Sequence, residues 1–231
     1  MKPDPVAPNV YRFEKLPDTS GWGINMLAAV LPDFGVVLYS PTWLGAGTFE
    51  AVDALGPVKV IIAPNGFHHL SLKRFREKYT SAIAAASGTA IKRLETKGHQ
   101  GLVDLSQLKL PAGVHVLEPE GLKNGEAWLS LPGELGTTWI VCDAWFNVKR
   151  PFTGFMGAML RALKTGPGLA VNLTFRWLAV GNVASYVASA RALLEAEKPT
   201  SIVVCHGDAI TSEGGTAAHE QARDILDRRL G

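Results

Sequence analysis

Several features that would place a chain in an extreme class of protein are missing from these 231 residues. The charges nearly cancel, with 23 Lys and Arg against 21 Asp and Glu, so a net charge of +2 gives no electrostatic reason to expect a nucleic-acid partner. No run approaches the roughly 18 uninterrupted apolar residues of a membrane span. No apolar signal-peptide segment follows residues 1–5, so we expect a cytoplasmic protein.

Cysteine is scarce, with only Cys142 and Cys205 in the chain. Each lies in an apolar run, directly before a residue that could serve a functional site. Side chains alternate along a strand, so each thiol would face away from the site residue that follows it. We therefore expect two buried core thiols rather than a disulfide or a pair of metal ligands.

Three common catalytic and nucleotide-binding motifs are also missing. No Gly-x-Ser-x-Gly sequence is present, which disfavours a standard Ser-His-Asp hydrolase. No P-loop is present, and no Gly-x-Gly-x-x-Gly follows a strand-like run. The remaining composition, 47% hydrophobic and 19% charged, is that of an ordinary globular protein, and we expect one domain over residues 1–231.

The apolar runs that are present end at residues able to bind a metal. Residues 61–63 lead into a turn that delivers His68 and His69, residues 139–142 stop at Asp143, and residues 202–205 stop at His206. Strands that end in this way assemble sites at one edge of the sheet in α/β proteins. Imidazole and carboxylate are the ligands that zinc and similar divalent ions prefer.

Hydrophobic periodicity and turn residues predict the order of the elements. We expect strands over 10–16, 24–31, 34–39, 58–63, 114–117, 127–131, 137–142 and 201–205. We expect helices over 48–54, 71–86, 182–197 and 216–230, and two short helices within 151–178 that are separated at 166–168.

The order of these elements and four short motifs resemble the metallo-β-lactamase fold over residues 10–230. The motifs are Ser40-Pro41, Ala63-Pro64-Asn65, Phe67-His68-His69-Leu70 and Val204-Cys205-His206-Gly207-Asp208, which are similar to those of an uncharacterised branch of that superfamily. The resemblance implies an α/β protein built as a four-layer αββα sandwich.

The ligand motif of the superfamily, His-x-His-x-Asp-His, is altered in this chain. If His69 matches its last histidine, His68 stands in place of the aspartate, and Pro64 and Gly66 replace the first two histidines. Glu134 stands where the superfamily has a histidine after Pro-Gly. Asp143 matches the bridging aspartate and His206 the late histidine. The resemblance thus implies that the three-histidine site is lost and that the second metal site is retained.

Two functional hypotheses follow from this pattern. In the first, one divalent metal, zinc or otherwise iron or manganese, is bound by His68, His69, Asp143 and His206. A metal-activated water then hydrolyses an ester, lactone, thioester or phosphoester in a small-molecule substrate. Asp143 and Asp208 are the candidate catalytic residues. The candidate pocket residues are Asn65, Glu134, Trp43, Trp145 and Arg150.

In the second hypothesis the fold is a metal-free binding or interaction module. His68, Asn65 and Asp143 would then form a structural hydrogen-bond network. The apolar segment 152–178 would form a surface for a partner or for a second copy of the chain. The sequence leaves both hypotheses open.

Overall fold

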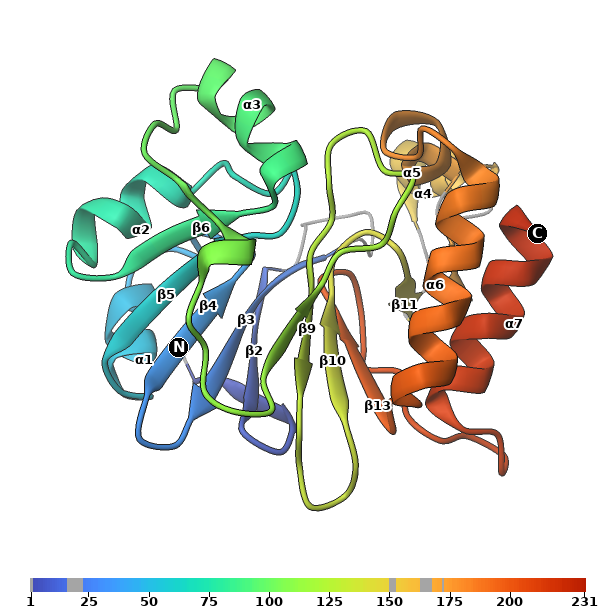
Figure 1. Cartoon of the computed structure of the whole chain (residues 1–231), viewed down its shortest axis with the longest axis horizontal. Coiled ribbons are helices and arrows are strands. Elements are labelled where there is room, and N and C mark those ends of the chain that lie inside the picture. The colour runs from blue at the N-terminus through green and yellow to red at the C-terminus, as the bar shows by residue number, and fades with distance from the viewer. Residues whose placement is uncertain (1, 16–22, 150–152, 163–167, 172) are drawn as a thin grey trace.

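The computed structural model of the chain describes all residues except 1, 16–22, 150–152, 163–167 and 172. Two sheets pack against each other at its centre, and helices cover the outer face of each sheet (Figure 1). This order of layers, helix–sheet–sheet–helix, confirms the αββα sandwich that the resemblance implies.

The first sheet has seven strands, and their order in the sheet follows their order in the chain. Neighbouring strands are antiparallel from β1 to β4 and parallel from β4 to β7. The strands are β1 (Asp4–Ala7), β2 (Val10–Lys15), β3 (Ile24–Leu31), β4 (Gly35–Tyr39), β5 (Val58–Ala63), β6 (Ile83–Ala86) and β7 (Val103–Asp104).

The second sheet has four strands in the order β13-β10-β9-β8. The β10–β13 pair is parallel and the other two pairs are antiparallel. The strands are β8 (His115–Leu117), β9 (Trp128–Leu131), β10 (Thr138–Val141) and β13 (Ser201–Val204). A separate antiparallel ribbon consists of β11 (Phe146–Val148) and β12 (Gly168–Ala170).

Two groups of helices form the outer layers (Figure 1). The first sheet is covered by α1 (Thr48–Asp53), α2 (Leu72–Lys78) and α3 (Gly88–Thr96). The second is flanked by α4 (Gly154–Ala162), α5 (Leu173–Leu178), α6 (Val183–Glu197) and α7 (Ala218–Leu230). A short 3-10 helix, η1 (Leu105–Gln107), follows β7. No helix among the described residues is long and apolar enough to cross a membrane.

Three apolar clusters hold the four layers together. One lies between the first sheet and its helices and includes Ile61 and Phe75. The second lies between the sheets and includes Ile62 and Ile140, and the third joins the second sheet to α6 and α7. Ile61 and Ile62 belong to different clusters because adjacent side chains of a strand face opposite sides of the sheet.

One predicted helix is wrong in its second half. The helix expected over 71–86 ends at Lys78, and Ile83–Ala86 forms β6 instead. Alanine favours helices, but here Ala85 faces the cluster between the sheets and Ala86 faces the helices. Parallel pairing with β5 and burial on both faces therefore outweigh the helix propensity of this segment. The helix α3 over Gly88–Thr96 was not predicted at all.

The C-terminal helices agree with the prediction. Asn182 precedes α6, and its side-chain oxygen accepts a hydrogen bond from the Ser185 backbone N–H, which satisfies an unpaired donor of the first turn. Helix α7 buries Ala218, Ala222, Ile225 and Leu226 on its inner face. The short helices expected within 151–178 are α4 and α5, with the strand β12 between them.

Candidate metal centre

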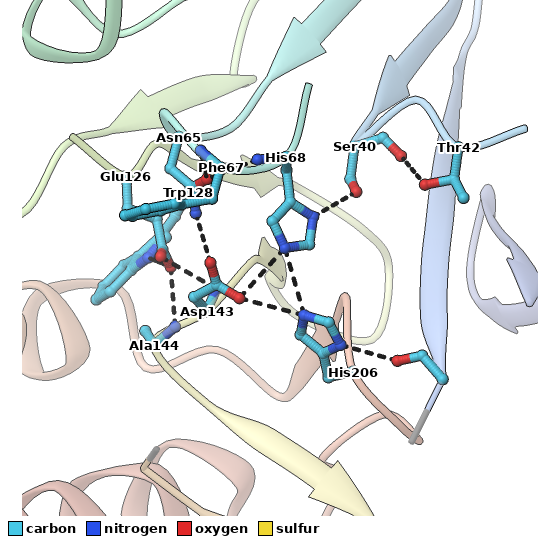
Figure 2. A network of polar contacts seen from close by, with 11 residues as sticks. Ser40, Thr42, Asn65, Phe67, His68, Glu126, Trp128, Asp143, Ala144 and His206 are labelled. Atoms are coloured by element: carbon cyan, nitrogen blue, oxygen red, sulfur yellow. Dashed lines mark hydrogen bonds and ion pairs between the residues drawn. The ribbon is translucent and has the colours of Figure 1, made fainter. Parts of the chain in front are cut away.

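Three strand ends bring His68, Asp143 and His206 together (Figure 2). His68 follows β5 of the first sheet, whereas Asp143 and His206 follow β10 and β13 of the second. Strands β10 and β13 are parallel, with Val141 opposite Val204, so the residues after them emerge at the same edge. The site therefore spans both sheets.

The three side chains place three potential ligand atoms in a nearly equilateral triangle. Asp143 Oδ1 lies 3.3 Å from His68 Nε2 and 3.2 Å from His206 Nε2. The two Nε2 atoms are 3.3 Å apart. Ligand atoms roughly 2.0–2.1 Å from a tetrahedral zinc ion lie roughly 3.3–3.4 Å from one another. The spacing and the chemistry of the donors both fit such an ion.

The turn that carries His68 is held by Asn65 and Ser40. The Asn65 side-chain oxygen accepts hydrogen bonds from the backbone N–H groups of Phe67, at 2.8 Å, and His68, at 3.0 Å. This turn is of the kind that Asn forms readily. Ser40 adopts a left-handed φ of 58° at the end of β4, and its Oγ lies 2.8 Å from His68 Nδ1. These contacts orient the imidazole so that Nε2 faces Asp143.

The turn that carries Asp143 is held by Glu126, a buried carboxylate just before β9. Its two oxygens accept hydrogen bonds from the backbone N–H groups of Asp143, at 3.0 Å, and Ala144, at 3.1 Å. Trp128 Nε1 donates a third hydrogen bond at 2.9 Å. The Asn65 amide also donates to Asp143 Oδ2 at 2.8 Å, so Asp143 Oδ1 is the oxygen that faces the histidines.

His206 is fixed through its second nitrogen and its ring face. Its Nδ1 donates to the carbonyl oxygen of Gly23 at 2.8 Å, which leaves the lone pair of Nε2 directed at the site in the neutral imidazole. The Phe146 ring stacks on it with centroids 4.6 Å apart. The next residue is Gly207, with φ +103°, and a Cβ there would lie 2.2 Å from the Asn147 carbonyl oxygen. Only glycine fits this approach.

The buried charges of the site shift one another's pKa. Burial alone would lower the pKa of His68, but the charge and hydrogen bond of Asp143 outweigh burial and raise it to about 9. Burial would raise the pKa of Asp143, yet the charge of His68 and the hydrogen bonds from His206 and His68 hold it well below its usual range. At neutral pH the metal-free site therefore pairs a His68 imidazolium with an Asp143 carboxylate. A cation bound by these atoms would displace that proton.

A cavity of about 220 Å³ opens over the triangle. Apart from His68, Asp143 and His206, its lining is Phe67, Phe146, Thr174, Phe175, Leu178 and Ala179. Three of these residues, Thr174, Phe175 and Leu178, belong to α5. The open side of the triangle is therefore accessible to a small molecule and mostly apolar.

His69 does not join the site, contrary to the ligand set predicted from the sequence. Its Nδ1 lies 2.9 Å from Nε2 of His99, and the two rings meet edge to face. The turn set by Asn65 directs two adjacent imidazoles to different parts of the molecule. His68, which stands in place of an aspartate in the superfamily motif, is the one that faces Asp143.

Two predicted carboxylates also lie elsewhere. Asp208 forms an ion pair with Arg12, at 2.8 Å, instead of orienting His206. Glu134 is exposed in the β9–β10 hairpin. Leu131 pairs with Thr138 at that hairpin, so Glu134 lies at the opposite end of β10 from Asp143. The match between the Pro132-Gly133 turn and the ligand loop of the superfamily, which the sequence suggested, is therefore wrong.

Of the predicted pocket residues, Asn65 belongs to the network of the site and two tryptophans do not line the cavity. Trp145 is fully buried and donates from Nε1 to the Ala222 carbonyl, so it is a core residue. Trp43 packs on Phe49, and the Arg74 guanidinium lies 4.3 Å from its ring centroid. Arg150 lies outside the described residues.

The two cysteines are fully buried free thiols in the cluster between the sheets, as expected. Burial raises the pKa of the Cys142 thiol well above its usual value. The sequence did not indicate that both sulfurs lie within 4.8 Å of a ring nitrogen of His68. They lie beneath the site, on the side away from solvent.

Sequence reasoning missed the supporting roles of Glu126 and Ser40. Ser40 belongs to the Ser40-Pro41 motif, but the motif indicates no role for its side chain. Its contact with His68 joins positions 28 residues apart. Glu126 lies in the poorly patterned stretch before β9, and only a carboxylate directly ahead of a buried strand could have drawn attention to it.

Comparison with known proteins relates the whole chain to one fold. The match to a metallo-β-lactamase from Pontibacter korlensis covers 99% of each chain, with a TM-score of 0.67 and 14% identity. A metallo-β-lactamase from Erythrobacter litoralis matches over 98% of this chain and 96% of its own, with a TM-score of 0.62 and 14% identity. The flavodiiron protein from Giardia intestinalis matches 99% of this chain and 59% of its own, with a TM-score of 0.64 and 14% identity.

No protein-family model matches the chain, and the search of curated proteins found no match. The solved structures show that the chain has the metallo-β-lactamase fold. At these identities the likeness extends to the fold alone, and function has to be argued from the site.

Proposed function

We propose that this protein is a metal-dependent hydrolase that holds one divalent ion through His68, Asp143 and His206. The observation that carries the proposal is the triangle of Nε2, Oδ1 and Nε2 atoms, whose sides of 3.2–3.3 Å match the edges of a tetrahedral zinc site. Two imidazoles and a carboxylate favour zinc, and the same donors suit iron or manganese.

The supporting contacts prepare the three ligands for this role. The Nδ1 atom of His206 is hydrogen-bonded to the Gly23 carbonyl, and the Nδ1 atom of His68 is hydrogen-bonded to Ser40 Oγ. Both Nε2 atoms therefore remain available to bind the ion. Asp143 supplies the negative charge, and its Oδ1 also lies where it can orient an attacking water. A divalent ion held there polarises a carbonyl or phosphoryl oxygen and lowers the pKa of water toward neutrality.

A single ion is the arrangement that the donors favour. Within the described part of the chain, the other group of possible ligands is His68 with Cys142 and Cys205. This group shares His68 with the first, and its thiols are sealed in the core with no exposed surface. We therefore propose a mononuclear centre whose open side faces the cavity, where a small molecule with an ester, lactone, thioester or phosphoester bond would bind.

A screen for lactone, thioester and phosphodiester hydrolysis, with and without zinc or manganese, tests the function. We expect turnover that requires the metal, that is lost in His206→Ala and that persists in His69→Ala, since His69 lies outside the site. A rate of hydrolysis that depends neither on the metal nor on His206 would contradict the proposal. So would the absence of hydrolysis of every substrate by protein shown to carry the ion.

A second candidate function is favoured by the same network. The hydrogen bond from Asn65 and the contacts with the His68 and His206 rings already surround Asp143 without an ion, as a structural role would require. The chain would then be a binding module, with exposed apolar side chains of α4 and α5, among them Phe155 and Trp177, as a surface for a partner or a second copy. A mass measurement in solution tests the second copy, and the metal content separates the two functions.

A further inference from the structure

The cavity beside the triangle differs from the site in its chemistry. Its walls come from separate segments: Phe67 from the loop after β5, Phe146 from β11, and Phe175 and Leu178 from α5. Among the lining residues that the structure describes, Thr174 is the one polar side chain apart from His68, Asp143 and His206. A bound molecule would therefore meet aromatic and aliphatic surface on one side and the reacting centre on the other.

Two positive charges close to the cavity are already engaged. Arg93 lies 4.6 Å from the Phe67 ring centroid and donates to the Gly66 carbonyl at 3.1 Å, and it does not line the cavity. Lys123 donates to the Trp177 carbonyl at 3.3 Å and does not line it either. Within the described lining, no lysine or arginine is available to pair with an anionic group of a substrate. A carboxylate placed against the aromatic and aliphatic wall, away from the three candidate ligands, would lose its hydration without gaining a lysine or arginine partner from the described lining.

The volume limits the size of the group that fits. A dry apolar cavity of roughly 150 Å³ accommodates one benzene molecule. The 220 Å³ over the triangle therefore accommodates one such ring and the few atoms of a reacting carbonyl. Leu178, which is 60% exposed, forms the edge through which the rest of a longer molecule could reach solvent.

We infer that the substrate carries a neutral apolar group, of about the size of a phenyl ring, directly beside the bond that is cleaved. This inference rests on the proposed hydrolase site and narrows its substrates to uncharged acyl compounds, such as aryl or branched-chain esters, lactones and thioesters. Molecules with a carboxylate on the group beside the reacting bond are then poor substrates.

Binding of matched amides, which needs no turnover, tests the inference. Acetamide, phenylacetamide and 4-carboxyphenylacetamide are titrated into ¹⁵N-labelled protein, with and without zinc, and followed by NMR. We expect phenylacetamide to perturb the amide signals of Phe67 and Phe146 and to bind roughly tenfold or more tightly than acetamide, because it buries a ring. We expect the carboxylate to weaken binding roughly tenfold.

Variants at the edge of the cavity make the test specific. Leu178→Lys is expected to strengthen binding of 4-carboxyphenylacetamide, and Leu178→Asp is expected to weaken it. The matched control is Trp177→Lys, at an exposed neighbour outside the lining, and it should leave this binding unchanged. Equal binding of all three amides, no binding of any, or insensitivity to both Leu178 variants would overturn the inference. A zinc content of zero with selective phenylacetamide binding would instead overturn the proposed hydrolysis and leave the apolar pocket intact.

Discussion

At the scale of single residues, the site depends on which of two adjacent histidines faces Asp143. The sequence identified the pair, the aspartate and the late histidine, because each follows an apolar strand. It could not decide between His68 and His69, since the choice depends on the side-chain hydrogen bonds of Asn65. A turn fixed by one such side chain leaves no periodic signal in the sequence. The motif alignment matched His69 to a ligand histidine of the superfamily and His68 to its aspartate, and in the structure His68 is the histidine that faces Asp143.

The raised pKa of His68 predicts how the metal-free protein responds to pH. Its pKa rises from 6.5 to about 9 on folding, so the stabilisation is complete below pH 6.5 and is lost as the pH rises through about 9. We expect the unfolding free energy in chelator to fall by roughly 1–3 kcal/mol between pH 7 and 9.5. Urea unfolding of wild type and His68→Gln measures it, and an equal pH dependence in both proteins would refute the assignment.

Asn65 joins the two sheets at the site, so its removal should affect stability and metal binding together. In Asn65→Ala the N–H groups of Phe67 and His68 and the carboxylate of Asp143 lose a partner. We expect a loss of roughly 1–3 kcal/mol in unfolding free energy and zinc binding weaker by roughly 10- to 100-fold. Urea unfolding and zinc titration measure the two effects. Asn65→Asp retains the acceptor for the turn but places a second carboxylate oxygen against Asp143 Oδ2, so its unfolding free energy near pH 7 should fall at least as much as that of Asn65→Ala. A smaller fall than in Asn65→Ala would contradict the role of the amide donor.

At the scale of elements, most strands were predictable because β-branched and apolar runs ended at clear turns. The exceptions arise where pairing between strands, rather than local propensity, decides the structure. Ile83–Ala86 forms a strand because β5 lies beside it, although its alanines favour a helix. Glu134 was assigned to a ligand loop because the sequence did not show that its turn closes a hairpin at the far end of β10.

The end of β13 provides a sharp test of backbone placement. Gly207→Ala would force a Cβ to within 2.2 Å of the Asn147 carbonyl oxygen at a φ of +103°. We expect a loss of more than roughly 2 kcal/mol of unfolding free energy, measured by urea denaturation. Gly214→Ala is the matched control, because φ is +58° and no atom lies within 4 Å of the added Cβ. Its cost should stay near roughly 1 kcal/mol, and equal costs at both positions would contradict the close approach.

At the scale of the whole molecule, the two sheets meet at a site to which each contributes candidate ligands. The fold could be predicted from element order and a few motifs, because layer architecture follows from the sequence of strands and helices. The apolar lining could not, since α5 and the loop after β5 are far apart in the chain and meet only in the folded protein.

An ion held by both sheets should stabilise the whole fold. Ligand bound only by the native state adds roughly 2.7 kcal/mol when its free concentration is 100 times the Kd. We expect zinc to raise the melting temperature of the wild type in a concentration-dependent way and to have no such effect on His206→Ala. Thermal unfolding measures this shift, and an equal shift in both proteins would place the ion elsewhere.

The metal content of protein purified without chelator or added metal tests the central claim most directly. The account predicts close to one divalent ion per chain in the wild type and in His69→Ala, and none in His68→Ala or His206→Ala that circular dichroism shows to be folded. A wild type without metal, or a metal content unchanged by loss of His68 and His206, would contradict it.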